Sequence, residues 1–211
     1  MKANTDATPL TPLDAFTYAS LVVLVVWAFT FVPSGWLGKI TAEASSYVLR
    51  ALGYSSSCGV VMGEAQLNLY GGARPVTVTI IRECTAINVF SVMVGLILPL
   101  KRGSWGRKLL GVVFSALVLF LLNVSRITLT VFLTGVDVPP FSWFFTSPTI
   151  EVYHYPISFM YGVIGVALLV LMVNSWILPE LGYTLLGVSG SLRDLVLREK
   201  SRRERTSESP V

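Results

Sequence analysis

Long apolar runs separated by short polar segments dominate the chain and predict helices that cross a membrane. Four such runs cover residues 15–32, 85–100, 109–133 and 155–178. A helix that spans the hydrocarbon core needs roughly 20 predominantly apolar residues, and each run comes near that length. The first run resembles a signal peptide in position, but no convincing small-residue cleavage site follows it. We therefore expect four spans, the first of them uncleaved.

The segment between the first two runs has a different pattern. Apolar residues between Lys39 and Leu52 recur at helical spacing, which predicts an amphipathic helix at the membrane face. Leu67–Tyr70 and Val76–Ile80 alternate apolar and polar positions around a glycine-rich turn, which predicts a β-hairpin. Because strand backbone cannot face lipid, we expect the whole segment 33–82 to lie outside the bilayer.

The composition agrees with a polytopic membrane protein. Of 211 residues, 53% are hydrophobic and 13% are charged, whereas soluble domains carry about 25% charged residues. We expect an all-α polytopic membrane protein with about four transmembrane helices, an extracytoplasmic amphipathic helix and a small β-hairpin. Residues 1–14 form a short lead in this interpretation, residues 15–178 the membrane-embedded catalytic domain, and residues 179–211 a basic cytoplasmic tail.

Basic residues predict the orientation in the cell membrane. Segment 101–108 carries four of them and no acid, and the tail is also basic. Cytoplasmic loops carry an excess of Lys and Arg, so both termini are expected in the cytoplasm. The loops 33–82 and 135–151 then face outside. Acids are interleaved with the basic residues of the tail, so an anionic leaflet suffices as its partner and nucleic-acid binding is not expected.

Three chemically distinctive residues are predicted to share the outer leaflet. Arg126 lies within the third run, and a charge inside a span suggests a functional site. At 1.5 Å rise per residue it lies about 25 Å from the inner end of its run, near the outer edge of the bilayer core. Cys84 begins the second run from outside, and His154 directly precedes the fourth. Asn123, three residues before Arg126, shares its helix face.

These residue types suit acyl transfer from a peptide. A thiol reacts as the thiolate, which a nearby cation or a helix N-terminus stabilises, and Arg82 and Arg126 are candidate cations for Cys84. Histidine can accept the thiol proton and later protonate a leaving amine. A guanidinium can bind an oxyanion. The candidate catalytic residues are therefore Cys84, Arg126 and His154, with supporting residues Asn123, Arg82 and Asn88.

Each candidate also has a simpler interpretation. Cys84 could form a disulfide with Cys58 or pack as a small residue. Arg126 could extend to the interface, and His154 could lie there with its tyrosine neighbours. One histidine and two cysteines are a poor metal-ligand set, so neither a metal nor another cofactor is expected.

The order of these motifs resembles the archaeosortase/exosortase family. Cys84 occurs in Glu-Cys-Thr-Ala, Asn123-x-x-Arg126 occurs in an apolar helix, and His154 precedes another apolar helix. The resemblance covers residues 75–175. Many members have Cys-Ser-Gly where this chain has Cys-Thr-Ala, and many have more than four spans.

The resemblance implies a membrane-embedded cysteine transpeptidase that faces outside. Its substrates would be secreted proteins with a C-terminal sorting signal, made of a short motif, a transmembrane helix and a basic end. Cys84 would form a thioester, Arg126 would stabilise the thiolate or the oxyanion, and His154 would act as general acid and base. The new C-terminus would pass to a lipid or another surface acceptor.

Two functions of other classes remain open at this point. A non-catalytic membrane assembly factor would use the outer hairpin as its contact surface, through strand addition. A membrane thiol oxidoreductase would use both Cys58 and Cys84. The two differ from the transpeptidase in which thiols they require.

Overall fold

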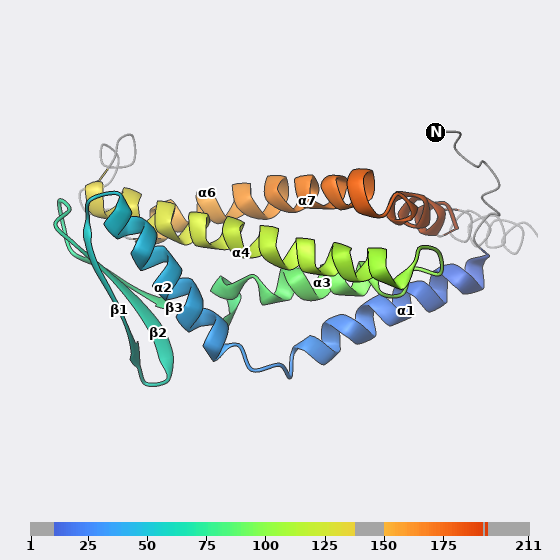
Figure 1. The fold of residues 1–211 in the computed structure, drawn as a ribbon, viewed down its shortest axis with the longest axis horizontal. Helices are drawn as coiled ribbons and strands as arrows, with labels where there is room; N and C mark the ends of the chain where they lie inside the picture. The colour runs from blue at the N-terminus through green and yellow to red at the C-terminus, as the bar shows by residue number, and fades with distance from the viewer. Residues whose placement is uncertain (1–10, 138–149, 192, 194–211) are drawn as a thin grey trace, which may run out of the picture.

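The computed structural model describes residues 11–137, 150–191 and 193. The long helices run along its long axis, and a small sheet lies at one end, which we call the sheet end (Figure 1). The elements are α1 (Pro12–Phe29), α2 (Gly35–Ala51), β1 (Ser55–Val61), β2 (Glu64–Tyr70), β3 (Val76–Ile80), the 3₁₀ turn η1 (Arg82–Thr85), α3 (Ile87–Ile97), α4 (Trp105–Val136), α6 (Ile150–Met160), the π-helical η2 (Tyr161–Gly165), α7 (Val166–Met172) and the π-helical η3 (Val173–Ile177).

Residues 1–10 of the predicted lead, 138–149 of the outer loop 135–151, and 192 and 194–211 of the tail lie outside the described residues. Residues 180–191 of the tail are helical.

Three of the four predicted spans are helices long and apolar enough to cross a membrane. They are α1, α4 and the continuous helix Ile150–Ile177. The run 85–100 instead yields α3, an apolar helix of 11 residues. At 1.5 Å per residue α3 is about 16 Å long, roughly half the hydrocarbon core. The left-handed residue Ala86 precedes the helix, and Pro99 follows its C-cap Leu98; both disfavour a longer helix.

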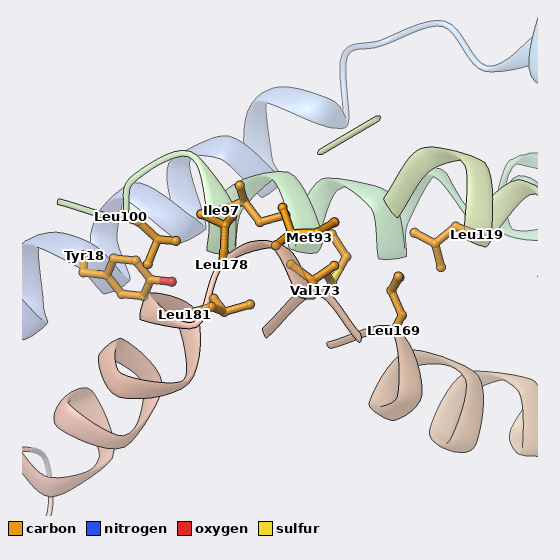
Figure 2. Packing of buried hydrophobic residues seen from close by; sticks show 10 residues of the cluster. Tyr18, Met93, Ile97, Leu100, Leu119, Leu169, Val173, Leu178 and Leu181 are labelled. Carbon is orange, nitrogen blue, oxygen red and sulfur yellow. The ribbon is translucent and has the colours of Figure 1, made fainter. Parts of the chain in front are cut away.

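An apolar cluster joins α1, α3, α4 and the last long helix away from the sheet end (Figure 2). Its buried members are Tyr18, Met93, Ile97, Leu100, Leu119, Leu169, Val173, Ile177, Leu178 and Leu181. Tyr18 is the polar exception, and its hydroxyl donates to the Leu96 carbonyl oxygen at 2.7 Å. A buried tyrosine hydroxyl needs such a partner, so this bond fixes α1 against α3.

The predicted hairpin is one part of a larger sheet. β2 and β3 pair antiparallel, as expected, but β1 pairs with the other edge of β2 to give the order β1-β2-β3. The prediction missed β1. Its sequence begins with Ser55-Ser56-Ser57 and contains Gly59, so it lacks the alternation of β-branched residues that marks a strand.

The predicted amphipathic helix is α2, which begins at Gly35 and ends at Ala51. Its buried face has small residues except at Leu49, and consists of Gly38, Thr41, Ala42, Ser45, Ser46 and Leu49. Small residues let α2 approach the sheet closely, and a Cβ on Gly38 would lie 3.4 Å from the Ile80 carbonyl oxygen. The apolar side chains Ile40, Tyr47 and Val48 stay exposed. Its placement at the membrane face remains a prediction.

Two arginines, one before and one after β3, cap the C-termini of long helices. Arg82 donates to the carbonyl oxygen of Phe29, the last residue of α1, at 2.6 Å, and to that of Val32, three residues further on, at 2.8 Å. Arg74 donates through Nε to the Thr134 carbonyl oxygen at 3.2 Å, near the end of α4. The last carbonyl groups of a helix lack intrahelical donors and carry partial negative charge. Cations therefore stabilise both ends.

Two neighbouring basic residues in the first turn of α4 cap two further helix ends. Lys108 donates to the carbonyl oxygen of Leu98 at 3.3 Å and to that of Leu100, just beyond α3. Arg107 donates through Nε to the Ile177 carbonyl oxygen, which ends η3, at 2.9 Å. The C-terminal ends of α1, α3, α4 and η3 thus all contact a cation from another part of the chain.

We expect Arg82→Met to destabilise the protein, because two carbonyl groups at the end of α1 lose a charged donor. Hydrogen bonds to charged groups contribute about 1.5–3 kcal/mol each, so the midpoint of thermal unfolding in detergent should fall clearly. Lys39→Met is the matched control. Lys39 is exposed and lies 4.0 Å from Glu43, and an equal loss of stability in this variant would contradict the capping role.

Candidate active site

Cys84 lies in the short 3₁₀ turn that joins β3 to α3. Its backbone N–H donates to the Ile81 carbonyl oxygen at 2.9 Å, and the Thr85 hydroxyl donates to that of Arg82 at 2.6 Å. Helix α3 begins at Ile87, so Cys84 precedes the helix and does not form its first turn, contrary to the prediction.

Ala86 holds the left-handed conformation that turns the chain from Cys84 into α3. Its φ is 58° and its ψ is 9°. This conformation costs a residue with a Cβ about 1–2 kcal/mol, and glycine adopts it freely. The strained backbone therefore adjoins the candidate nucleophile, a common location for such strain.

Two side chains of α4 bind the backbone of Cys84. The amide of Asn123 donates to the Cys84 carbonyl oxygen at 2.7 Å, and Nη2 of Arg126 donates to the same oxygen at 3.4 Å. The predicted shared face of these two residues is confirmed. The guanidinium of Arg126 also interacts electrostatically with the Cys84 side chain. Its Nε is buried and has no hydrogen-bond partner in the described part of the chain.

His154 lies on α6, close enough to Arg126 for an electrostatic interaction. The helix already includes Ile150, so His154 lies inside it, and the prediction that the helix starts at Tyr155 is wrong by at least one turn. The helix continues through Pro156, and proline is tolerated inside helices of membrane proteins. No hydrogen bond joins His154 to Cys84 among the residues described. Arg126 is the residue that interacts with both.

Ser158 is a neighbour of His154 that the sequence analysis missed. Its hydroxyl lies 3.4 Å from Nε2 of His154. The spacing of four residues along a helix is the signal that could have identified it.

The other two supporting candidates lie differently. Arg82 is close to Cys84 in sequence, but its guanidinium binds the end of α1. Asn88 is exposed on the first turn of α3, and its carbonyl oxygen accepts from the Ser91 hydroxyl. Of the three supporting candidates, Asn123 is the one whose side chain binds Cys84.

Both cysteines are free thiols. Cys58, on β1, and Cys84 pack against the same apolar cluster between the sheet, α2 and α4. Among the described residues, no group of three His, Cys, Asp or Glu side chains is arranged to hold a metal ion.

Comparison with known families identifies the chain. The family model described as transmembrane exosortase matches residues 11–173. The chain belongs to this family. The match includes Cys84, Asn123, Arg126 and His154, and it confirms the resemblance drawn from the sequence. The exosortase family is known as one of cysteine transpeptidases. No curated protein and no solved structure matches this exosortase.

We expect Arg126→Gln to slow the alkylation of Cys84 by iodoacetamide roughly tenfold at neutral pH, because a nearby cation favours the thiolate. The measurement uses a Cys58→Ser background, so that only Cys84 reacts. Arg50→Gln is the control, since Arg50 is exposed on α2 and its guanidinium hydrogen-bonds Ser46 of the same helix. Equal rates in the two variants would show that Arg126 does not act on the thiol.

Proposed function

We propose that this exosortase is a membrane cysteine transpeptidase that cleaves C-terminal sorting signals of secreted proteins and transfers the new C-terminus to a lipid. Family membership supports the reaction class. The observation that carries the assignment of residues is the pair of α4 donors, Asn123 and Arg126, on the backbone of Cys84. These donors fix the candidate nucleophile beside a guanidinium.

In the first step, Sγ of Cys84 bonds to the carbonyl carbon of the scissile peptide, and the thiol proton passes to His154. The carbonyl oxygen becomes an oxyanion. Arg126 supplies positive charge there, and its buried, unpartnered Nε is a donor available to that oxygen. Preorganised donors of this kind stabilise the tetrahedral intermediate because they need no rearrangement during the reaction.

In the second step, the C–N bond breaks and His154 returns the proton to the leaving amine. The product is a thioester between Cys84 and the shortened protein. A hydroxyl or amine of the acceptor then attacks the thioester carbon, its proton passes to His154, and the thiol is regenerated. The sequence exchanges one acyl bond for another and consumes no oxidant or reductant.

A transmembrane sorting signal would pack beside α3, α4 and the helix Ile150–Ile177, and its preceding motif would lie near Cys84. In the proposed orientation the sheet end faces outside and both termini are cytoplasmic, because segment 101–108 is basic.

The proposal is tested by co-expression with a candidate substrate that carries a C-terminal sorting signal. We expect Cys84→Ala to accumulate uncleaved precursor while unfolding at the wild-type temperature, and Cys58→Ala to process normally. The mass of the mature C-terminus gives the cleavage site and shows whether an acceptor was added.

The same variants separate the other function classes. A thiol oxidoreductase needs both cysteines, so loss of function in Cys58→Ala would favour it. An assembly factor needs neither thiol, so normal processing in Cys84→Ala would falsify the transpeptidase proposal.

A further inference from the structure

The tip of the β2–β3 hairpin packs directly on the C-terminal end of α4. Gly72 and Gly135 approach so closely that a Cβ on Gly72 would lie 2.5 Å from the Gly135 carbonyl oxygen. The backbone N–H of Arg74 donates to the same oxygen at 3.4 Å. The hairpin and α4 therefore meet backbone to backbone at Gly72, whereas a Cβ on Gly135 would clash with the side chain of Leu69.

Asp137, the residue that ends α4, links this contact to α6. Its Oδ1 accepts from Nη2 of Arg74 at 2.7 Å and from the hydroxyl of Tyr153 at 3.5 Å. The backbone of Asp137 is left-handed, with φ 59°, and its N–H donates to the Leu133 carbonyl oxygen. One carboxylate oxygen thus connects three segments: the hairpin, the end of α4 and the first turns of α6.

Tyr153 is the residue before His154, and its side chain is 1% exposed. Adjacent residues on a helix point about 100° apart, so the rotation that buries Tyr153 also sets the direction of His154. The imidazole itself is weakly held, by the 3.4 Å contact with Ser158 and an edge-on contact with Tyr155. Pro156 also removes one hydrogen bond from this part of the helix.

We propose that Arg74, Asp137 and Tyr153 form a clamp that positions His154 relative to Cys84. The hairpin is the physical link, because β3 begins just after Arg74 and leads through Ile80 into the Cys84 turn. The clamp thereby holds both the thiol-bearing turn and the imidazole-bearing helix against α4. This inference rests on the proposed function, in which His154 transfers protons at Cys84, and it makes Tyr153 and Asp137 positioning residues.

The test is the pH profile of Cys84 alkylation by iodoacetamide, measured on the full chain in detergent with Cys58→Ser as background. The difference in alkylation rate between this background and the His154→Ala variant measures the contribution of the imidazole. We expect Tyr153→Phe and Asp137→Asn each to remove most of that difference. Combined with His154→Ala, neither should change the profile further, because their effect passes through His154.

Tyr155→Phe is the matched control. It removes a hydroxyl from the same helix, on the other side of His154, where the side chain is 69% exposed. We expect it to keep the profile of the background. Arg74→Lys retains a cation for Asp137 and should keep most of the imidazole contribution.

Several results would overturn the clamp. They are unchanged profiles in Tyr153→Phe and Asp137→Asn, additive effects with His154→Ala, or a His154→Ala profile that matches the background. Thermal unfolding identifies a variant that fails to fold, and the other clamp variant then decides. Because alkylation needs no substrate, an intact clamp without signal cleavage would count against the proposed function alone.

Discussion

The fold depends on satisfying the carbonyl groups at the ends of helices that lie in or near lipid. An unsatisfied backbone group costs several kcal/mol where no water is present. In this chain Arg82, Lys108, Arg74 and Arg107 supply the missing donors at the ends of α1, α3, α4 and η3. Each of these cations lies outside the helix that it caps. The caps therefore stabilise single helix ends and also tie the helices to one another.

The candidate site lies between two of these caps. Arg74 precedes β3 and binds the end of α4, while Arg82 follows β3 and binds the end of α1. The strand and the Cys84 turn are held at both ends as a result. Asn123 and Arg126 then bind the Cys84 carbonyl oxygen from α4. A few part-buried polar contacts thus define the position of the turn that carries the thiol.

The parts of the fold that depend on local periodicity could be predicted from the sequence. The apolar runs gave three of the long helices, and the three-residue spacing of Asn123 and Arg126 gave their shared face. The role of Arg82 could not be predicted, because its partners at and just beyond the end of α1 lie 50 and 53 residues earlier. The start of α3 was misplaced for a local reason: the left-handed residue is Ala86, and alanine gives no signal of that conformation where glycine would.

Strand β1 was missed because its serines and glycine are held by pairing with β2 and not by their own preference. The choice of Cys84, Arg126 and His154 as candidates rested on their common predicted depth and on their chemistry, and their catalytic roles stay a prediction. The electrostatic interactions of Arg126 with Cys84 and His154 depend on the packing of α4 against both η1 and α6, which no single stretch of sequence predicts.

Synthesis proceeds from the N-terminus, so the position of each capping residue in the sequence sets when its helix end can be capped. When α1 emerges, its cap Arg82 has yet to be made, so the end of α1 depends on water or lipid headgroups until the sheet is complete. The ends of α4 and η3 are different. Arg74 precedes Thr134 by 60 residues and Arg107 precedes Ile177 by 70. Both capping residues are therefore synthesised before the helix ends that they cap. Among these three helices, α1 is therefore the one that is synthesised before the residue that caps it.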